Sequence, residues 1–259
     1  VIVRQPQHTE PLAIHSGKHS NRKASVTTPF QQVLSAPGAA WLRFHIKGYK
    51  LGRNSYVRFT SALDGSAQRL DAKSLQDWEN STAALRGDSV LVELQVAPGD
   101  TGAYIEFDQM TVGEFVGEDT LEDMIETLCG SDNRTASNDV RVGRIQGCTA
   151  WLTSNGALLT AGHCADIDPD QGGPQLPNGL LDLAGDVEFD IPQSLNDGTQ
   201  VPAHPDNVYP IDTSSIVWNF DGVGQGLTES PVMERGDPVI DHELLVPSPG
   251  ILDHHHALF

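Results

Sequence analysis

Apolar and polar residues alternate along much of the chain up to about residue 116. Four segments show the alternation most clearly, with turn-forming residues between them: 41–51, 55–63, 89–98 and 103–112. In a β-strand, alternation places every second side chain on the same face. Several short strands of this kind are typical of a sandwich of two sheets, each with one buried face. We therefore predict a β-sandwich over residues 31–116, after an extended lead-in over residues 1–30.

The pattern changes after the sandwich. Apolar residues at helical spacing follow acidic ones in residues 117–139, which predicts a linker with a short helix. Strand-forming runs return from residue 140, and beyond Cys164 the chain is rich in Gly, Pro, Asp and Asn, which favours long loops on a β framework. The sequence thus predicts an all-β chain whose second domain covers residues 140–259.

A short segment of this second domain predicts a β-hairpin. Two strand-forming runs, 148–153 and 157–160, flank an Asn-Gly dipeptide, which is the strongest short signal for a hairpin. A tight hairpin returns the chain beside Cys148, so that Cys148 and Cys164 come within reach of a disulfide bond. Such a bridge closes a short loop, stabilises the fold by roughly 3 kcal/mol, and holds the adjacent His163 in place.

The residues around His163 carry candidate chemistry. A histidine that acts as general base must be held within hydrogen-bond reach of its nucleophile, and a carboxylate fixes its tautomer. The sequence LLTAGHC, with the upstream cysteine and a Trp-Leu-Thr strand between, resembles the histidine box of the trypsin-like serine proteases. That resemblance implies a fold of two β-barrels with the active site between them. It also implies hydrolysis of protein or peptide substrates through a Ser-His-Asp triad, with His163 as the base and no cofactor.

Neighbouring segments extend the resemblance toward bacterial secreted members of the family. Residues 129–145 are similar to the segment that leads into the first barrel, and residues 186–194 and 204–216 are similar to the loop and strand between the histidine and the aspartate. The resemblance implies a secreted or periplasmic protein, in which Cys129 bonds to a cysteine in the missing C-terminal barrel. The N-terminal sandwich resembles the jelly-roll modules that often precede such proteases.

No segment of the chain matches the motif that carries the nucleophile in this family. It lies in a Gly-Asp-Ser-Gly-Gly-Pro turn, whose backbone N–H groups converge on the oxyanion. None of the serines after His163 has the flanking glycines of such a turn: Ser194, Ser214, Ser215, Ser230 and Ser248. Two similar segments, 87–89 and 170–174, are interpreted as loops. We therefore expect a jelly-roll-like sandwich followed by the first barrel of a trypsin-like protease, incomplete at the C-terminus and inactive as it stands.

The orienting carboxylate is less sharply defined by the sequence. Asp253 precedes an Ala-Leu-Phe at nearly the family spacing, although three histidines stand where about two residues, including a tryptophan, are expected. Asp253 is therefore the candidate, and Asp212 and Asp221 are weaker alternatives. The histidines, His254–His256, could be read as metal ligands together with His242. Consecutive residues of a strand point to opposite faces, so a solvated tail is the better interpretation and no metal site is predicted.

The amino-acid composition limits the classes of partner that the protein can bind. Thirty-five acidic and sixteen basic residues give a net charge of −19, which repels the phosphate backbone and excludes nucleic acid. No apolar run is long enough to span a bilayer. An alternative function remains open, namely a secreted binding or adhesion protein that uses the sandwich and carries a degenerate protease half. Four aromatic residues could form its ligand platform, but their strand spacing favours core packing: Trp41, Tyr49, Tyr56 and Trp78.

Overall fold

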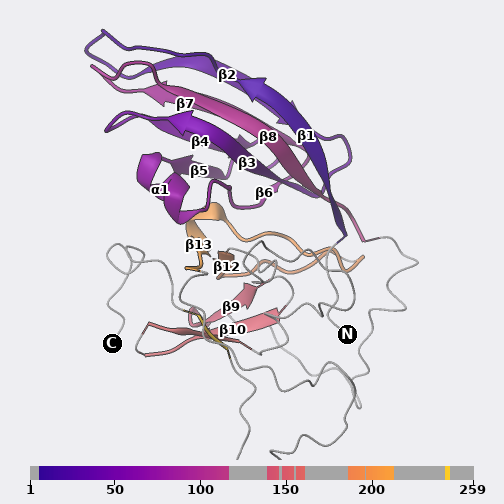
Figure 1. Cartoon of the computed structure of the whole chain (residues 1–259). Coiled ribbons are helices and arrows are strands. Elements are labelled where there is room, and N and C mark those ends of the chain that lie inside the picture. The colour runs from indigo at the N-terminus through magenta and orange to yellow at the C-terminus, as the bar shows by residue number, and fades with distance from the viewer. Residues whose placement is uncertain are drawn as a thin grey trace, which may run out of the picture. The chain divides into compact units, whose positions relative to one another are not determined.

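The computed structural model divides the chain into two compact units (Figure 1). It describes residues 6–116, 139–145, 148–154, 156–160, 186–195, 197–212 and 243–245. The sandwich unit comprises Gln5–Ala136 and Ile191–Val208, and the hairpin unit comprises Val1–Arg4, Ser137–Asp190 and Tyr209–Phe259. Strands dominate the described residues, and the α-helix among them is short. The predicted all-β class is confirmed.

Eight strands of the sandwich unit form two antiparallel sheets. Their orders are β1-β8-β3-β6 and β2-β7-β4-β5, which is the order of an eight-stranded jelly roll. The bounds of the elements are β1 (Gln7–His15), β2 (Thr27–Ser35), β3 (Trp41–Lys50), β4 (Tyr56–Ser61), β5 (Ala67–Leu70), α1 (Ala72–Asp77), β6 (Leu85–Arg86), β7 (Ser89–Val96), β8 (Tyr104–Gly113) and the 3-10 helix η3 (Pro205–Asn207).

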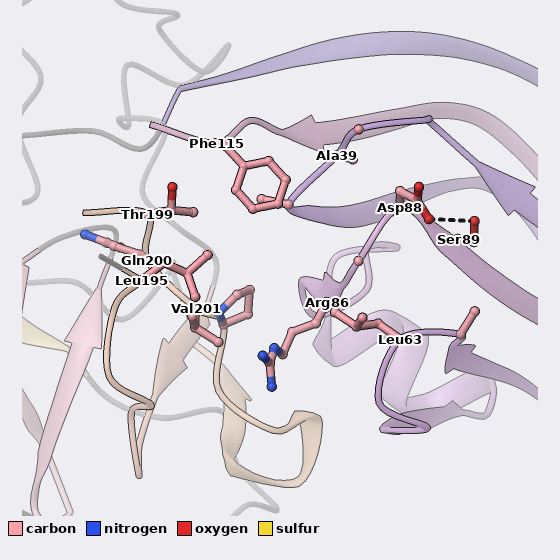
Figure 2. A pocket seen from close by; sticks show the side chains of 15 residues that line it. Ala39, Leu63, Arg86, Asp88, Ser89, Phe115, Leu195, Thr199, Gln200 and Val201 are labelled. Carbon is pink, nitrogen blue, oxygen red and sulfur yellow. Dashed lines mark hydrogen bonds between the residues drawn. The ribbon is translucent and has the colours of Figure 1, made fainter. Parts of the chain in front are cut away.

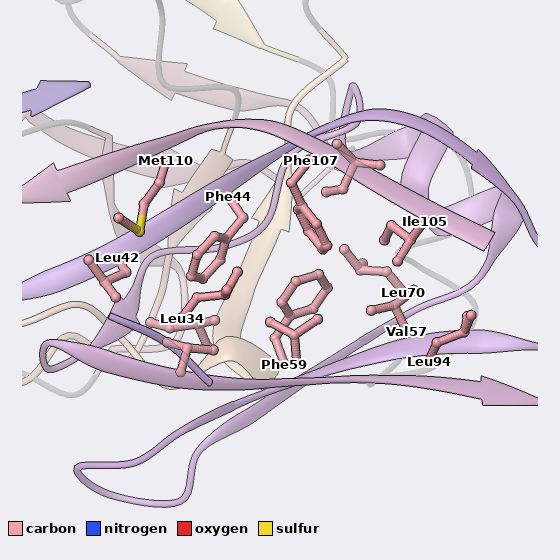
Figure 3. Packing of buried hydrophobic residues seen from close by; sticks show 14 of the residues in the cluster. Leu34, Leu42, Phe44, Val57, Phe59, Leu70, Leu94, Ile105, Phe107 and Met110 are labelled. Carbon is pink, nitrogen blue, oxygen red and sulfur yellow. The ribbon is translucent and has the colours of Figure 1, made fainter. Parts of the chain in front are cut away.

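The core lies between the two sheets (Figure 3). Along β7, every second residue from Val90 to Val96 is buried, as the alternation predicts. Phe44, Phe59 and Phe107 come from β3, β4 and β8 and pack together, with ring centroids 5.9 to 6.2 Å apart. Each such aromatic pair contributes about 0.5–1.5 kcal/mol beyond the area that it buries. The three rings therefore join strands of both sheets.

The four aromatic residues singled out in the sequence do not form an exposed platform. Trp41 is buried, and Tyr49 and Trp78 are partly buried against the core. The ring of Tyr56 is covered by the guanidinium of Arg69, whose Cζ lies 3.8 Å from the ring centroid. Core packing therefore accounts for Trp41, Tyr49 and Trp78, whereas Tyr56 packs against Arg69.

The sandwich begins earlier in the chain than the sequence predicted. Residues 1–30 were expected to be a lead-in, but β1 covers Gln7–His15 and β2 begins at Thr27. β1 is an edge strand whose inward-facing residues are only partly buried, and its pairing with β8 shifts between Pro11 and Ile14. An irregular edge strand does not need the regular apolar alternation on which the prediction depended.

A downstream segment also belongs to the sandwich unit. The backbone N–H of Val116 donates to Oγ1 of Thr199 at 2.8 Å. Ala203 and Val208 are buried against Ala83, with Trp78 beside them. Sequence analysis assigned this segment, Ile191–Val208, to the region 140–259, whereas the structure groups it with the jelly roll. Contacts between residues this far apart leave no periodic signal in the sequence.

The described part of the hairpin unit is one sheet of short strands. Its order is β13-β12-β9-β10-β11-β14, so that the described strands form an open sheet. Ile145, Ala150, Leu158, Val187 and Ile211 form its buried core. The bounds are β9 (Val142–Ile145), β10 (Cys148–Leu152), β11 (Leu158–Thr160), β12 (Asp186–Glu188), β13 (Val208–Pro210) and β14 (Glu243–Leu245).

A substitution at Gly113 tests how tightly the sandwich is packed. A Cβ atom at Gly113 would collide with the indole ring of Trp41. We expect Gly113→Ala to lower the free energy of unfolding by about 1–3 kcal/mol, because the indole must shift within a packed core. Urea denaturation of the 259-residue protein, monitored by tryptophan fluorescence, measures this change.

Gly48→Ala is the matched control. Gly48 lies in the same sheet, and a Cβ there would be 3.8 Å from the nearest atom, Oε2 of Glu106, which is an ordinary contact. We expect this variant to be neutral or slightly stabilising, since alanine restricts the unfolded chain more than glycine does. Equal destabilisation by the two substitutions would contradict the packing argument.

Candidate functional site

The hairpin that leads to His163 is present as predicted. β10 and β11 are antiparallel, with Ala150 opposite Thr160 and Leu152 opposite Leu158. The turn is closed by the N–H of Thr153, which donates to the carbonyl of Ala157 at 2.8 Å. Gly156 has a φ of 83°, which glycine adopts without strain and which explains its place in the Asn-Gly signal.

The open end of this hairpin is held firmly. Thr160 is fully buried, and its hydroxyl donates to the carbonyl of Thr149 at 2.8 Å. At the same open end, β9 pairs with β10 so that Cys148 lies opposite Ile145. The chain therefore leaves β11 toward residues 161–164 from a well-defined position.

An ion pair holds β12 beside β9 in the same unit. Nε of Arg144 donates to Oε2 of Glu188 at 2.9 Å, and both side chains are only 13% exposed. The partial burial strengthens the attraction between the two charges relative to a surface pair. The pair thus fixes the position of β12 relative to β9.

The predicted catalytic residues lie outside the described residues. They are His163 and Asp253. The weaker candidate Asp221 and the cysteines Cys129 and Cys164 also lie outside the described residues. Cys148 is not a free thiol, but its pairing with Cys164 remains a prediction. Asp212 is described and follows the buried Ile211. The region of the histidine tail, His242 and His254–His256, is likewise not described.

A histidine–aspartate pair that the sequence did not reveal lies on the sandwich. Nδ1 of His45 on β3 is 2.7 Å from Oδ1 of Asp108 on β8, although the two residues are 63 positions apart. The hydrogen bond from His45 holds the pKa of the Asp108 carboxyl below its usual range. A β-bridge places Ser81 opposite His45, but the Ser81 hydroxyl donates to the carbonyl of Phe44. The pair thus resembles a base that is oriented by a carboxylate, but within the described part of the chain no hydroxyl is hydrogen-bonded to the His45 ring.

A second cluster of charges joins the ends of β1 and β8. Nδ1 of His8 is 2.6 Å from Oε1 of Glu114, and Nε2 is 3.3 Å from Oε1 of Glu10. Hydrogen bonds from the imidazole to Glu114 and, to a smaller extent, Glu10 raise the pKa of His8 above its ordinary value. The protonated imidazole bridges two carboxylates that are far apart in sequence.

A cleft of about 550 Å³ lies within the sandwich unit (Figure 2). Most of its wall is apolar, and its charged side chains are Arg86 and Asp88. Its residues come from loops of the sandwich, from β6, from the start of β7 and from the downstream segment: Gly38, Ala39, Ala40, Ala62, Leu63, Arg86, Gly87, Asp88, Ser89, Phe115, Leu195, Thr199, Gln200, Val201 and Pro202. Residues 87–89, interpreted above as a loop, form part of this wall. The sequence analysis did not identify the cleft, because its segments are distant from one another along the chain.

The described residues contain no group of three or more His, Cys, Asp or Glu side chains that could hold a metal ion. Among the same residues, none of the helices is long and apolar enough to cross a membrane.

The charge cluster at His8 predicts a pH dependence. Because the folded-state pKa of His8 is raised, its stabilising contribution is complete below the unfolded-state pKa of histidine and is lost as the pH rises through the folded-state value. We expect Glu114→Gln to lower the pKa of His8 toward its ordinary value, and Glu10→Gln to lower it less. NMR titration of the imidazole resonances measures both shifts.

Glu106→Gln serves as the control for this titration. Glu106 lies on β8, the strand that ends one residue before Glu114. Its carboxylate pairs with Lys47, at 2.9 Å, and not with His8. The substitution should leave the titration of His8 unchanged. A His8 pKa that is insensitive to Glu114→Gln would show that the two side chains do not interact in solution.

The sequence matches no protein-family model and no curated protein. The candidate functions therefore rest on the residues and contacts of this chain.

Proposed function

We propose that residues 140–259 are the histidine-bearing half of a trypsin-like serine protease. The observation that carries this proposal is the β10–β11 hairpin, which joins Cys148 to the segment that contains His163. The protein would then hydrolyse peptide bonds only with a serine supplied from outside this sequence. Residues 1–259 by themselves would be inactive.

The register of the hairpin supports the proposed disulfide. Ala150 lies opposite Thr160, so the same antiparallel register, extended by two residues, would bring Cys148 opposite Gly162. Cys164 is two residues beyond that position. A disulfide requires Cα atoms about 4.4–6.8 Å apart, so a bridge would require the chain after Gly162 to bend back toward Cys148. A bridge there would restrict the backbone on the C-terminal side of His163.

The residues of this chain would perform two parts of the reaction. His163 would take the proton from the serine hydroxyl as its oxygen attacks the peptide carbonyl, and would return that proton to the leaving amine. Asp253 would accept a hydrogen bond from the other ring nitrogen and so keep His163 in the reactive tautomer. The oxyanion-binding N–H groups and the serine would come from the second barrel.

A binding function for the sandwich is the second candidate. The cleft of about 550 Å³ in the sandwich unit favours it, since clefts of roughly 300–1,000 Å³ are typical of ligand sites. The two candidates are compatible, because modules placed before a secreted protease can bind a partner or substrate. They differ in whether the region around His163 contributes to activity.

The disulfide is tested by mass spectrometry of peptides from the unreduced protein. We expect a cross-linked species that joins the peptide containing Cys148 to the one containing Cys164, with Cys129 in neither. The digest must be carried out at acidic pH, where thiolate exchange is slow. A cross-link between Cys148 and Cys129 would contradict the proposed position of His163.

The catalytic role is tested by labelling with a serine-reactive fluorophosphonate. We expect no labelling of the 259-residue chain at the region after His163, and stoichiometric labelling of any longer product of the same gene that includes a Gly-Asp-Ser-Gly-Gly turn. His163→Ala should abolish labelling in that longer protein, because the serine loses its base.

His204→Ala is the control for the labelling experiment. His204 is exposed, and its ring accepts a hydrogen bond from the N–H of Asp206 at the start of η3, so this variant should be labelled normally. Full labelling of the His163→Ala variant would overturn the proposed function, as would stoichiometric labelling of a serine after His163 in the 259-residue chain.

A further inference from the structure

The cleft in the sandwich unit gathers exposed apolar side chains. Leu63, Phe115 and Leu195 line it, and they are 65%, 49% and 43% exposed. Exposed large apolar residues that occur singly need no explanation, but a group of them around one cavity marks a binding surface. These three come from the β4–β5 turn, the end of β8 and the downstream segment.

The backbone around the cleft is fixed by hydrogen bonds. The N–H of Ala40 donates to the carbonyl of Gly113 at 2.7 Å, and the N–H of Gly87 donates to the carbonyl of Ala40 at 2.8 Å. On the opposite wall, the N–H of Leu195 donates to the carbonyl of Thr199 at 2.9 Å. A wall held in this way loses little conformational entropy when a ligand binds.

Arg86 is the cation of the cleft. Figure 2 shows its guanidinium extending toward Val201. Nη1 donates to Oδ2 of Asp64 at 3.3 Å, a long contact, and the Arg86 side chain is 36% exposed. A guanidinium carries five N–H donors, so the contact with Asp64 leaves donors for a ligand. Asp88 also lines the cleft, and its Oδ1 accepts a hydrogen bond from the Ser89 hydroxyl at 2.8 Å.

We propose that this cleft binds the carboxyl-terminal residue of a peptide with an apolar side chain. The side chain would lie among Leu63, Phe115 and Leu195, and the terminal carboxylate would accept hydrogen bonds from the guanidinium of Arg86. The planar guanidinium suits a carboxylate because it can donate two parallel hydrogen bonds.

This inference goes beyond the proposed protease function and does not depend on it. A hydrolase that cleaves peptide bonds releases new carboxyl termini, so the two activities would be complementary. The cleft lies wholly within the sandwich unit, however, and none of its residues belongs to the segment that contains His163. Loss of one activity therefore leaves the other testable.

The test measures binding of a fluorescein-labelled pentapeptide that ends in leucine with a free carboxylate. Fluorescence anisotropy with the 259-residue protein should show saturable binding, and the same peptide with a carboxamide end should bind about tenfold more weakly. Arg86→Gln should weaken binding of the acid by a similar factor and leave binding of the amide unchanged. Phe115→Ala should weaken binding of both peptides.

Two controls separate this effect from a change in folding or in overall charge. Arg58→Gln removes the same charge from an exposed position of β4 outside the cleft and should not change binding. The urea midpoint of Arg86→Gln should match that of the unmodified protein. Equal affinity for acid and amide peptides would overturn the proposal, as would the absence of saturable binding. Tight binding of decanoate without binding of the peptide would assign the cleft to small apolar acids and would also overturn it.

Discussion

The sandwich depends on the exclusion of water from the apolar faces of two sheets. Each face is formed by every second residue of its strands, and neither face can be buried unless the other covers it. Phe44, Phe59 and Phe107 meet between the sheets, where all three are fully buried. Because the strands are held in register by this core, the loops at their ends occupy defined positions, and the wall of the cleft is built from those loops.

The cleft also depends on a segment from much later in the chain. Thr199 accepts a hydrogen bond from the backbone of Val116, and Ala203 and Val208 are buried beside Ala83. Without the residues near Thr199, the cleft would lack one wall. The two proposed functions are therefore encoded in interleaved parts of the sequence, since the segment that completes the cleft follows His163. A single domain boundary at the predicted linker, residues 117–139, therefore does not describe how the chain divides into units.

Several features were predictable from the sequence because they follow from local rules. The alternation in β7 predicted a half-buried strand, and the Asn-Gly dipeptide predicted the β10–β11 hairpin. Other features were not predictable. β1 carries a weak pattern because it lies at the edge of a sheet, where partial burial allows polar residues on both faces. The pairing of His45 with Asp108 depends on which strand lies beside β3, and the sequence of either strand contains no information about its neighbour.

What the sequence by itself determined is local: that segments with regular alternation, such as β7, are strands, and where the chain turns between β10 and β11. The tertiary structure alone decided that the strands adopt the order of a jelly roll, that the segment near Thr199 closes a cleft beside Phe115, and that Arg86 is its cation. The physical reason is the range of the interactions. Periodicity and turn preference act between near neighbours, whereas strand order and cavities result from contacts between residues that are distant along the chain.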